Sequence, residues 1–261
     1  MTDLIKTQEE GVATLTLNRP DVRNAYSESM VAMMVEYLNE IERDSTINVV
    51  VLRGAGKSFC AGGDLNAMAN RTGMFAGDPT ELRNHYRLGI QEMTRRFQSF
   101  EKPVIAAVHG AAVGAGLGLA TMCDIRVVAS GTKFGAPFPK LGLIPGDGSA
   151  YLLARAIGYS RAMELVISAR IFDADEAYRM GLVHYVVEGE KKDLADLVYE
   201  KALRVATDIA ALPSKAVQLT KSHLQQTWHG DVNTALHLAA AYQGMVQRSE
   251  EHIQAVKNLQ K

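Results

Sequence analysis

The sequence predicts an α/β fold with a mostly parallel β-sheet, followed by a helical C-terminal region. Three short runs, residues 49–52, 104–108 and 125–129, are mainly apolar and rich in β-branched side chains. Such runs are typical of strands that are buried on both faces. Segments with helical periodicity separate them, and this alternation of strand and helix indicates crossover units that build a parallel sheet.

The N-terminal part of the chain shows one further strand and two helical segments. Residues 14–17 (TLTL) alternate in polarity after Gly11, which predicts a strand that ends at the Asn18-Arg19-Pro20 breaker. A helix is expected to begin at Ser27, because apolar side chains then recur on one helical face; they are Met30, Met33, Met34, Tyr37, Leu38 and Ile41. Residues 79–100 are also helical by periodicity, and residues 111–122 form a short segment of small side chains and glycine.

The C-terminal part carries no strand signal after about Asp193. Three amphipathic helices are expected there, at residues 194–205, 214–226 and 231–247, and their apolar faces need a partner. We therefore divide the chain into a core, residues 1–192, and a C-terminal helical region, residues 193–261.

The composition excludes several classes of protein. With 261 residues, of which 47% are hydrophobic and 22% charged, the chain can bury a large core. A formal net charge of −1 and a pI of about 6.7 argue against a nucleic acid or an anionic membrane as partner. Cys60 and Cys123 lie far apart and show no metal-ligand spacing, so we expect two small buried side chains in a reducing compartment and no metal site. No run approaches the roughly 20 apolar residues of a membrane span, and the N-terminus lacks a signal-peptide pattern, so we expect a cytoplasmic protein.

Glycines crowd the segments that follow two of the predicted strands. Gly56-Lys57-Ser58 supplies the second half of a phosphate-binding P-loop, but the first glycine would have to be residue 51, which is a valine within a strand. The glycines at 110, 114, 116 and 118 do not fit the G-x-G-x-x-G pattern of dinucleotide-binding folds. Two explanations remain open: the glycines allow tight packing of backbone segments, or they let two backbone N–H groups converge on one ligand oxygen as an oxyanion hole.

Five stretches of the sequence resemble one family. They are LNRPDVRNA (17–25), KSFCAGGDL (57–65), KPVIAAVHGAAVGAGLGLATMCDIRVVA (102–129), FGAPFPKLGLIPGDGSAYLLARAIG (134–158) and ARIFDADEAYRMGLVHYVV (169–187). These stretches resemble the crotonase, or enoyl-CoA hydratase/isomerase, superfamily, and they follow the family's order along nearly the whole chain. The resemblance is specific for the family and much less specific for the reaction.

The resemblance implies a core built as a superhelix of β-β-α turns and an acyl-CoA enzyme of the kind used in fatty acid metabolism. It implies a homotrimer, in some members a pair of trimers, with the helices after Asp193 between subunits. Coenzyme A would enter as part of the substrate thioester, with no separate cofactor. Carried over by position, the oxyanion donors are the backbone N–H groups of Gly63 and Ala115, which would stabilise a thioester enolate.

The resemblance also suggests where coenzyme A would bind. It would lie against Arg23 and the backbone of residues 61–65, that is Ala61, Gly62, Gly63, Asp64 and Leu65, with Lys57 as a weaker candidate. For both Arg23 and Lys57, the alternative is a solvated surface cation without a ligand. Asp64 is expected mainly to order the loop by accepting hydrogen bonds from backbone N–H groups.

The sequence departs from the hydratase pattern at two positions. Hydration needs a base and an acid, and the hydratases use two glutamates for them; here Gly118 and Phe138 stand at those positions. Phe138 would make one wall of the pocket apolar, which suits a bulky or aromatic acyl group. Isomerase-type or other crotonase chemistry therefore stays open, and so does a non-catalytic oligomer that binds acyl-CoA.

Asp147 is the candidate acid/base group. Other members carry an aspartate in the GLIP-D turn, at the position of Gly146, whereas the acid here follows one residue later. Asp147 either reaches the substrate or caps the helix that begins near Ser149. Histidines 85 and 109 are weaker candidates: His85 for the mouth of the pocket and His109 for a structural position after the central strand.

Overall fold

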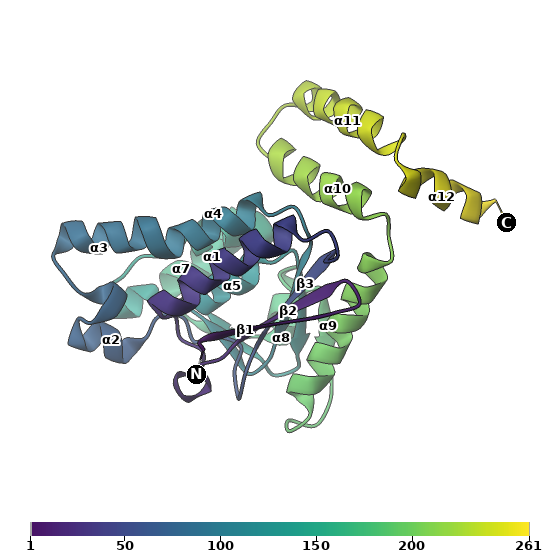
Figure 1. Cartoon of the computed structure of the whole chain (residues 1–261). Helices are drawn as coiled ribbons and strands as arrows, with labels where there is room; N and C mark the ends of the chain where they lie inside the picture. Colours follow the sequence, from purple (N-terminus) through teal and green to yellow (C-terminus); the bar gives the residue numbers. More distant parts are fainter. Residues whose placement is uncertain (1, 261) are drawn as a thin grey trace.

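A six-stranded sheet forms the centre of the computed structural model, which describes residues 2–260 (Figure 1). Its strands, in spatial order, are β1 (Leu4–Glu9), β2 (Val12–Leu17), β3 (Val49–Gly54), β4 (Val104–Val108), β6 (Ile125–Ala129) and β9 (Tyr185–Val187). All neighbouring pairs are parallel except β1 and β2. The predicted parallel sheet is confirmed. Strand β1 escaped prediction because it is an edge strand on which only Leu4 is buried, so it shows no alternation.

A smaller sheet stands beside the first. It contains β5 (Ala111–Val113), β7 (Lys133–Gly135) and β8 (Ile171–Asp173), in that order. The segment 111–122, expected as a stretch of small residues, thus divides into strand β5 and helix α5 (Ala115–Met122). Small side chains suit both elements, because their backbones lie close to neighbouring segments.

One face of the large sheet is covered by helices that carry most of the core. The main ones are α1 (Glu28–Arg43), α4 (Gln91–Ser99), α5, α6 (Ser149–Ile157) and α7 (Tyr159–Ser168), whereas α3 (Pro79–His85) buries no residue. As predicted, Ser27 caps α1, and its side chain accepts a hydrogen bond from the backbone N–H of Met30 at 3.0 Å. The helical run predicted for residues 79–100 is present, but a π-helical turn, η3 (Tyr86–Ile90), interrupts it between α3 and α4. The short helical segments are η1 (Pro20–Val22), α2 (Leu65–Asn70), η2 (Gly73–Phe75), η4 (Phe138–Leu141) and α8 (Ala174–Arg179).

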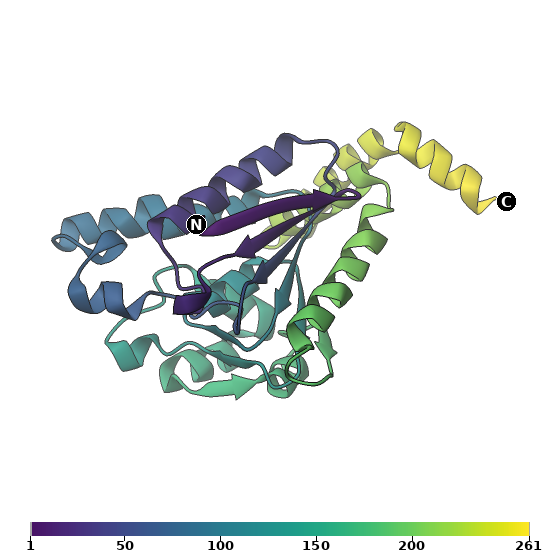
Figure 2. The ribbon, with the colours of Figure 1, turned by 60° about the horizontal axis from the view of Figure 1, so that its bottom comes forward.

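The opposite face of the sheet is covered by α9 (Leu194–Ala210). Its buried side chains, among them Val198 and Ala202, pack against valines and alanines of β3, β4 and β6, and Figure 2 shows the helix running beside the strands. We expected the apolar face of this first C-terminal helix to need a partner beyond the core. Instead the sheet of the same chain supplies that partner.

Three further helices follow, α10 (Ser214–Thr227), α11 (Val232–Val246) and α12 (Glu250–Leu259). They extend away from the sheet at the upper right of Figure 1. Helices α11 and α12 bury no residue, and they expose large apolar side chains such as Leu236, Met245 and Ile253. The first two match predicted helices, whereas α12 was not predicted. Within residues 2–260, no helix is long and apolar enough to span a bilayer.

Candidate active site

Two glycine-containing segments meet at one edge of the large sheet. Strands β3 and β4 are parallel neighbours, with Val50 paired to Val104, so the segments that follow them leave the sheet on the same side. The two segments are joined by backbone hydrogen bonds: the N–H of Phe59 donates to the His109 carbonyl at 2.9 Å, and the N–H of Val113 donates to the Cys60 carbonyl at 3.1 Å. The tertiary structure therefore brings residues 58–64 and 109–115 together.

Glycine is required where these backbones touch. A Cβ atom on Gly116 would lie 2.1 Å from the carbonyl oxygen of Cys60, and one on Gly62 would lie 2.6 Å from that of Val113. Gly62 also has a φ of +87°, which favours glycine. Close packing thus explains these two positions.

A cavity of about 290 Å³ opens where the two segments meet. Gly63 and Ala115 both line it, and their backbone N–H groups donate no hydrogen bond to any residue between 2 and 260. Ala115 is the first residue of α5, where an N–H group has no partner within the helix. The other lining residues are Tyr26, Ala61, Leu65, Met68, Phe75, Tyr86, Ile90, Val113, Gly114, Pro137, Phe138, Lys140, Leu141, Leu143, Gly146 and Asp147. Two unpaired backbone donors therefore border a mainly apolar cavity.

Asp147 supplies the one carboxylate of that lining in the described part of the chain. The residue is only 2% exposed. Its Oδ1 accepts hydrogen bonds from the backbone N–H of Ser149 at 3.1 Å and from the Ser149 hydroxyl at 2.6 Å, while Oδ2 has no partner among residues 2–260. Burial raises the pKa of this carboxyl, and the hydrogen bonds from Ser149 oppose that rise. The Oδ1 atom of Asp147 thus accepts hydrogen bonds from the first residue of α6, and Oδ2 accepts none from the described residues.

Two neighbours of Asp147, Gly118 and Thr94, define its position. A Cβ atom on Gly118 would be 2.3 Å from Asp147 Oδ2, so the carboxylate occupies the space that a side chain at 118 would need. From α4, the Thr94 hydroxyl donates a hydrogen bond to the Asp147 carbonyl at 2.7 Å. Gly118 therefore lies beneath the carboxylate and outside the cavity lining, whereas Phe138 forms part of the wall.

The residues expected to meet coenzyme A lie along one loop and beside it. The Ala61 N–H donates to the Arg23 carbonyl at 2.9 Å, and the side chains of Arg23 and Lys57 are both exposed. Asp64 orders the loop as expected, since its Oδ1 accepts from the N–H groups of Asn66 and Ala67 and so caps α2. Leu65 is 59% exposed and lines the cavity.

Sequence reasoning missed several residues that line the cavity. Tyr26 is fully buried, and its hydroxyl donates to the Ala115 carbonyl at 3.1 Å; it comes from the segment before α1. Tyr86 and Ile90 come from the π-helical turn. Both residues lie in the helix predicted at residues 79–100, and helical periodicity does not distinguish a cavity-lining side chain from a core side chain.

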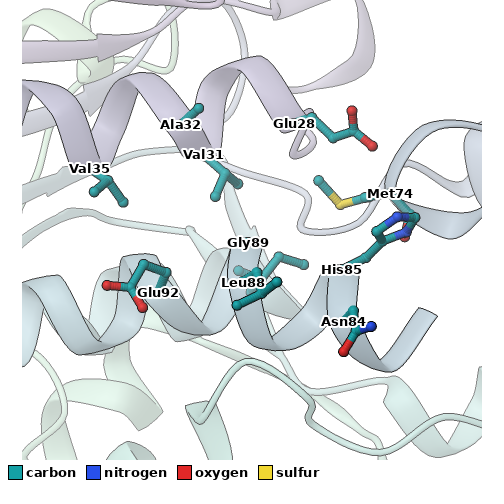
Figure 3. A pocket seen from close by; sticks show the side chains of 11 residues that line it. Glu28, Val31, Ala32, Val35, Met74, Asn84, His85, Leu88, Gly89 and Glu92 are labelled. Atoms are coloured by element: carbon teal, nitrogen blue, oxygen red, sulfur yellow. The ribbon is translucent and has the colours of Figure 1, made fainter. Parts of the chain in front are cut away.

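A second, larger cavity of about 490 Å³ lies between α1 and the helical run α3–α4 (Figure 3). It is lined mainly by apolar side chains and includes neither glycine segment. His85 lies in this cavity and not in the first one, and its Nδ1 is 3.2 Å from the Met74 carbonyl oxygen. His109 holds the loop after β3, with Nε2 2.9 Å from the Gly56 carbonyl oxygen, and burial lowers its pKa. Neither histidine lies at the cavity that Gly63 and Ala115 line.

Comparison with known proteins finds one family throughout. The family model described as enoyl-CoA hydratase/isomerase matches residues 7–260. The chain is 38% identical over 248 residues to the 1,2-epoxyphenylacetyl-CoA isomerase of Escherichia coli, covering 95% of this chain and 91% of the relative. It is 37% identical to the short-chain-enoyl-CoA hydratase of Clostridium acetobutylicum, covering 90% and 86%. The crystal structure of an enoyl-CoA hydratase from Bacillus anthracis superposes with a TM-score of 0.90 at 29% identity, over 99% of this chain and 96% of that one.

Proposed function

The chain belongs to the enoyl-CoA hydratase/isomerase family and is an acyl-CoA enzyme of that kind; from this premise we propose that it moves a double bond in an enoyl-CoA thioester. The observation that carries the proposal is the buried Asp147 carboxylate, which has one unpartnered oxygen and lines the same cavity as two unpaired backbone N–H groups. One acid/base group and one oxyanion site suffice for this reaction.

Gly63 and Ala115 would provide the oxyanion site. Their N–H groups would donate hydrogen bonds to the thioester oxygen as it gains negative charge, and a donor of this kind is typically worth about 3 kcal/mol. The position of Ala115 at the N-terminus of α5 supports this role, because the helix dipole favours negative charge there. The hydroxyl of Tyr26 holds the Ala115 carbonyl and so restrains this segment.

Asp147 would carry the proton. As a carboxylate, it would take a proton from C2 of a 3-enoyl thioester. The electron pair of the broken C–H bond would move into a dienolate, whose oxygen would accept hydrogen bonds from the N–H groups of Gly63 and Ala115. The same carboxyl then returns the proton to C4, which leaves the double bond between C2 and C3 and leaves the enzyme unchanged. A raised pKa suits this shuttle, because it makes the carboxylate a stronger base toward a carbon-bound proton.

Hydration would need a second acid/base group beside Asp147. Gly118 and Phe138 stand at the positions of the two hydratase glutamates in the resemblance, and neither has a side-chain group that can transfer a proton. Over the described residues, the cavity offers no second carboxylate. These features favour double-bond isomerisation, even though several relatives are named hydratases.

The cavity favours a bulky or aromatic acyl group. Phe75, Tyr86 and Phe138 contribute aromatic walls, and one similar protein is named 1,2-epoxyphenylacetyl-CoA isomerase. Coenzyme A would lie outside, along Gly62, Asp64 and Leu65, with a phosphate near Arg23 and a weaker contact with Lys57. It would come as part of the substrate, and no separate cofactor is needed.

We further propose that the protein is a homotrimer, or a pair of trimers, assembled through its C-terminal helical region. Because α9 packs on the sheet, the contacts would come from α10, α11 and α12, whose exposed apolar side chains are otherwise in solvent. Mass measurement in solution tests the assembly.

Proton exchange in deuterated water tests the proposed chemistry. The wild-type protein is incubated with 3-enoyl-CoA and 2-enoyl-CoA thioesters, both linear and aryl-substituted. We expect deuterium at C2 and C4 and interconversion of the two isomers, without 3-hydroxyacyl-CoA. Accumulation of 3-hydroxyacyl-CoA would show hydration instead, and binding without any exchange or turnover would favour a non-catalytic acyl-CoA-binding oligomer.

A further inference from the structure

The π-helical turn places the phenol ring of Tyr86 against the loop that carries Asp147. A Cβ atom on Gly146 would lie 2.8 Å from Tyr86 Cε1, so the ring rests on the bare backbone of that glycine. Gln91, one residue after the turn, donates from its Nε2 to the Gly146 carbonyl at 3.0 Å and ties the same two segments together. Turns of this kind often occur at functional sites because they re-aim a side chain within a helix.

The Tyr86 hydroxyl has no hydrogen-bond partner among residues 2–260, although the side chain is half-buried and lines the cavity. The other tyrosine of the lining, Tyr26, donates to the Ala115 carbonyl. Burial, and then the nearby charge of Asp147, raise the pKa of Tyr86, so the phenol keeps its proton. The hydroxyl is therefore a proton-bearing donor in a mainly apolar cavity.

The geometry points to Tyr86 as a specificity-determining residue that donates a hydrogen bond to an oxygen atom on the acyl group. The preferred substrates would accordingly be acyl-CoA thioesters whose acyl chain carries a hydroxyl, epoxide or carbonyl oxygen beyond the thioester. This inference rests on the proposed function only in taking the cavity for the acyl site. The hydroxyl is not enclosed by protein atoms, so an acyl group that fills the cavity would take it out of contact with water. A ligand oxygen that accepts its hydrogen bond is then favoured, because an unsatisfied polar group is costly in an apolar surrounding.

The test compares ligands that differ by one oxygen. Hexanoyl-CoA and its 3-oxa, 4-oxa and 5-oxa analogues, in which an ether oxygen replaces one methylene, are titrated into the wild-type protein and Tyr86→Phe by calorimetry. An ether oxygen only accepts hydrogen bonds, so it reports on Tyr86 and not on the Asp147 carboxylate. We expect Tyr86→Phe to weaken binding of at least one ether about tenfold and to change hexanoyl-CoA binding less than about twofold.

Two controls make the outcome decisive. Tyr178→Phe removes a hydroxyl from an exposed tyrosine on α8 and should leave all four affinities unchanged, and melting curves confirm that Tyr86→Phe stays folded. If Tyr86→Phe alters all four ligands by one factor, or none of them, the inference is wrong. Exchange of the C2 protons of 3-hexenoyl-CoA is followed separately in wild type and Asp147→Asn. Its absence from the wild type refutes the proposed function, while ether discrimination alone would still support Tyr86.

Discussion

Replacing Asp147 by asparagine is expected to stabilise the fold at pH values above the folded pKa of Asp147, while it removes the acid/base group. Burial raises the pKa of Asp147 above its usual value in the folded chain, whereas the unfolded chain has the usual value. The stabilisation from this group is therefore complete below the unfolded pKa and is lost as the pH rises through the folded pKa. Asparagine does not titrate and escapes that loss.

The size of the effect follows from the contacts of the two carboxylate oxygens. The asparagine oxygen can keep both hydrogen bonds from Ser149, at 3.1 and 2.6 Å. Its amide nitrogen then replaces Oδ2, which has no partner, so an unpartnered buried charge becomes an unpartnered buried neutral group. Since such a neutral group costs about 1–3 kcal/mol and a charged one more, we expect a gain of about 1–2 kcal/mol above the folded pKa. For a chain of this size, that gain raises Tm by about 2–8 °C.

Melting curves measured from about pH 4 to pH 9 test this linkage, with Asp208→Asn as the control because Asp208 is an exposed carboxylate on α9. The Tm difference for Asp147→Asn should grow as the pH rises and should be small at the acid end. In the isomerisation assay, kcat should fall by at least about 100-fold, as for the loss of a general acid/base. A Tm difference that is independent of pH, or a variant less stable than wild type at high pH, would refute the reasoning about burial. Retained activity would remove Asp147 from the mechanism.

Three further substitutions probe the rest of the site. Gly118→Ala places a Cβ atom 2.3 Å from Asp147 Oδ2, so kcat should drop at least about tenfold and the free energy of unfolding should fall by about 1–3 kcal/mol. The control is Gly244→Ala, which lies in open space on α11 and should stabilise the fold slightly. An unchanged kcat in Gly118→Ala would count against a catalytic role of Asp147. Arg23→Asn, which tolerates the positive φ of that position, should raise the Kd for coenzyme A about tenfold in calorimetry; an unaltered Kd would make Arg23 a plain surface cation. Ile90 lines both cavities, so Ile90→Ala should raise kcat/KM for long acyl chains relative to short ones in a chain-length series, at a cost of about 2–5 kcal/mol in stability; an unshifted preference would show that the cavities stay separate.

The local pattern of the sequence determined the central elements of the fold. Strands β3, β4 and β6 were predicted because a strand covered on both faces reads as a continuous apolar run, whichever residues cover it. Helix α1 was predicted because its apolar side chains repeat with the helical period and Ser27 precedes them. Strand β1 was missed because only Leu4 is buried on it, so burial imposes no alternation. Helix α12 was missed although α11, which likewise buries no residue, was predicted.

The resemblance to the family, carried over by position, indicated Gly63 and Ala115 as the candidate oxyanion donors, and that role stays a prediction. Only the tertiary structure decided what surrounds them. The free oxygen of Asp147, the space over Gly118 that it fills, and the phenol of Tyr86 all depend on contacts between segments far apart in the chain. Periodicity reports which face of an element is buried, but it does not report which distant side chain lies against that face. The chemistry of this cavity is set by such contacts, and for that reason it had to be read from the folded chain.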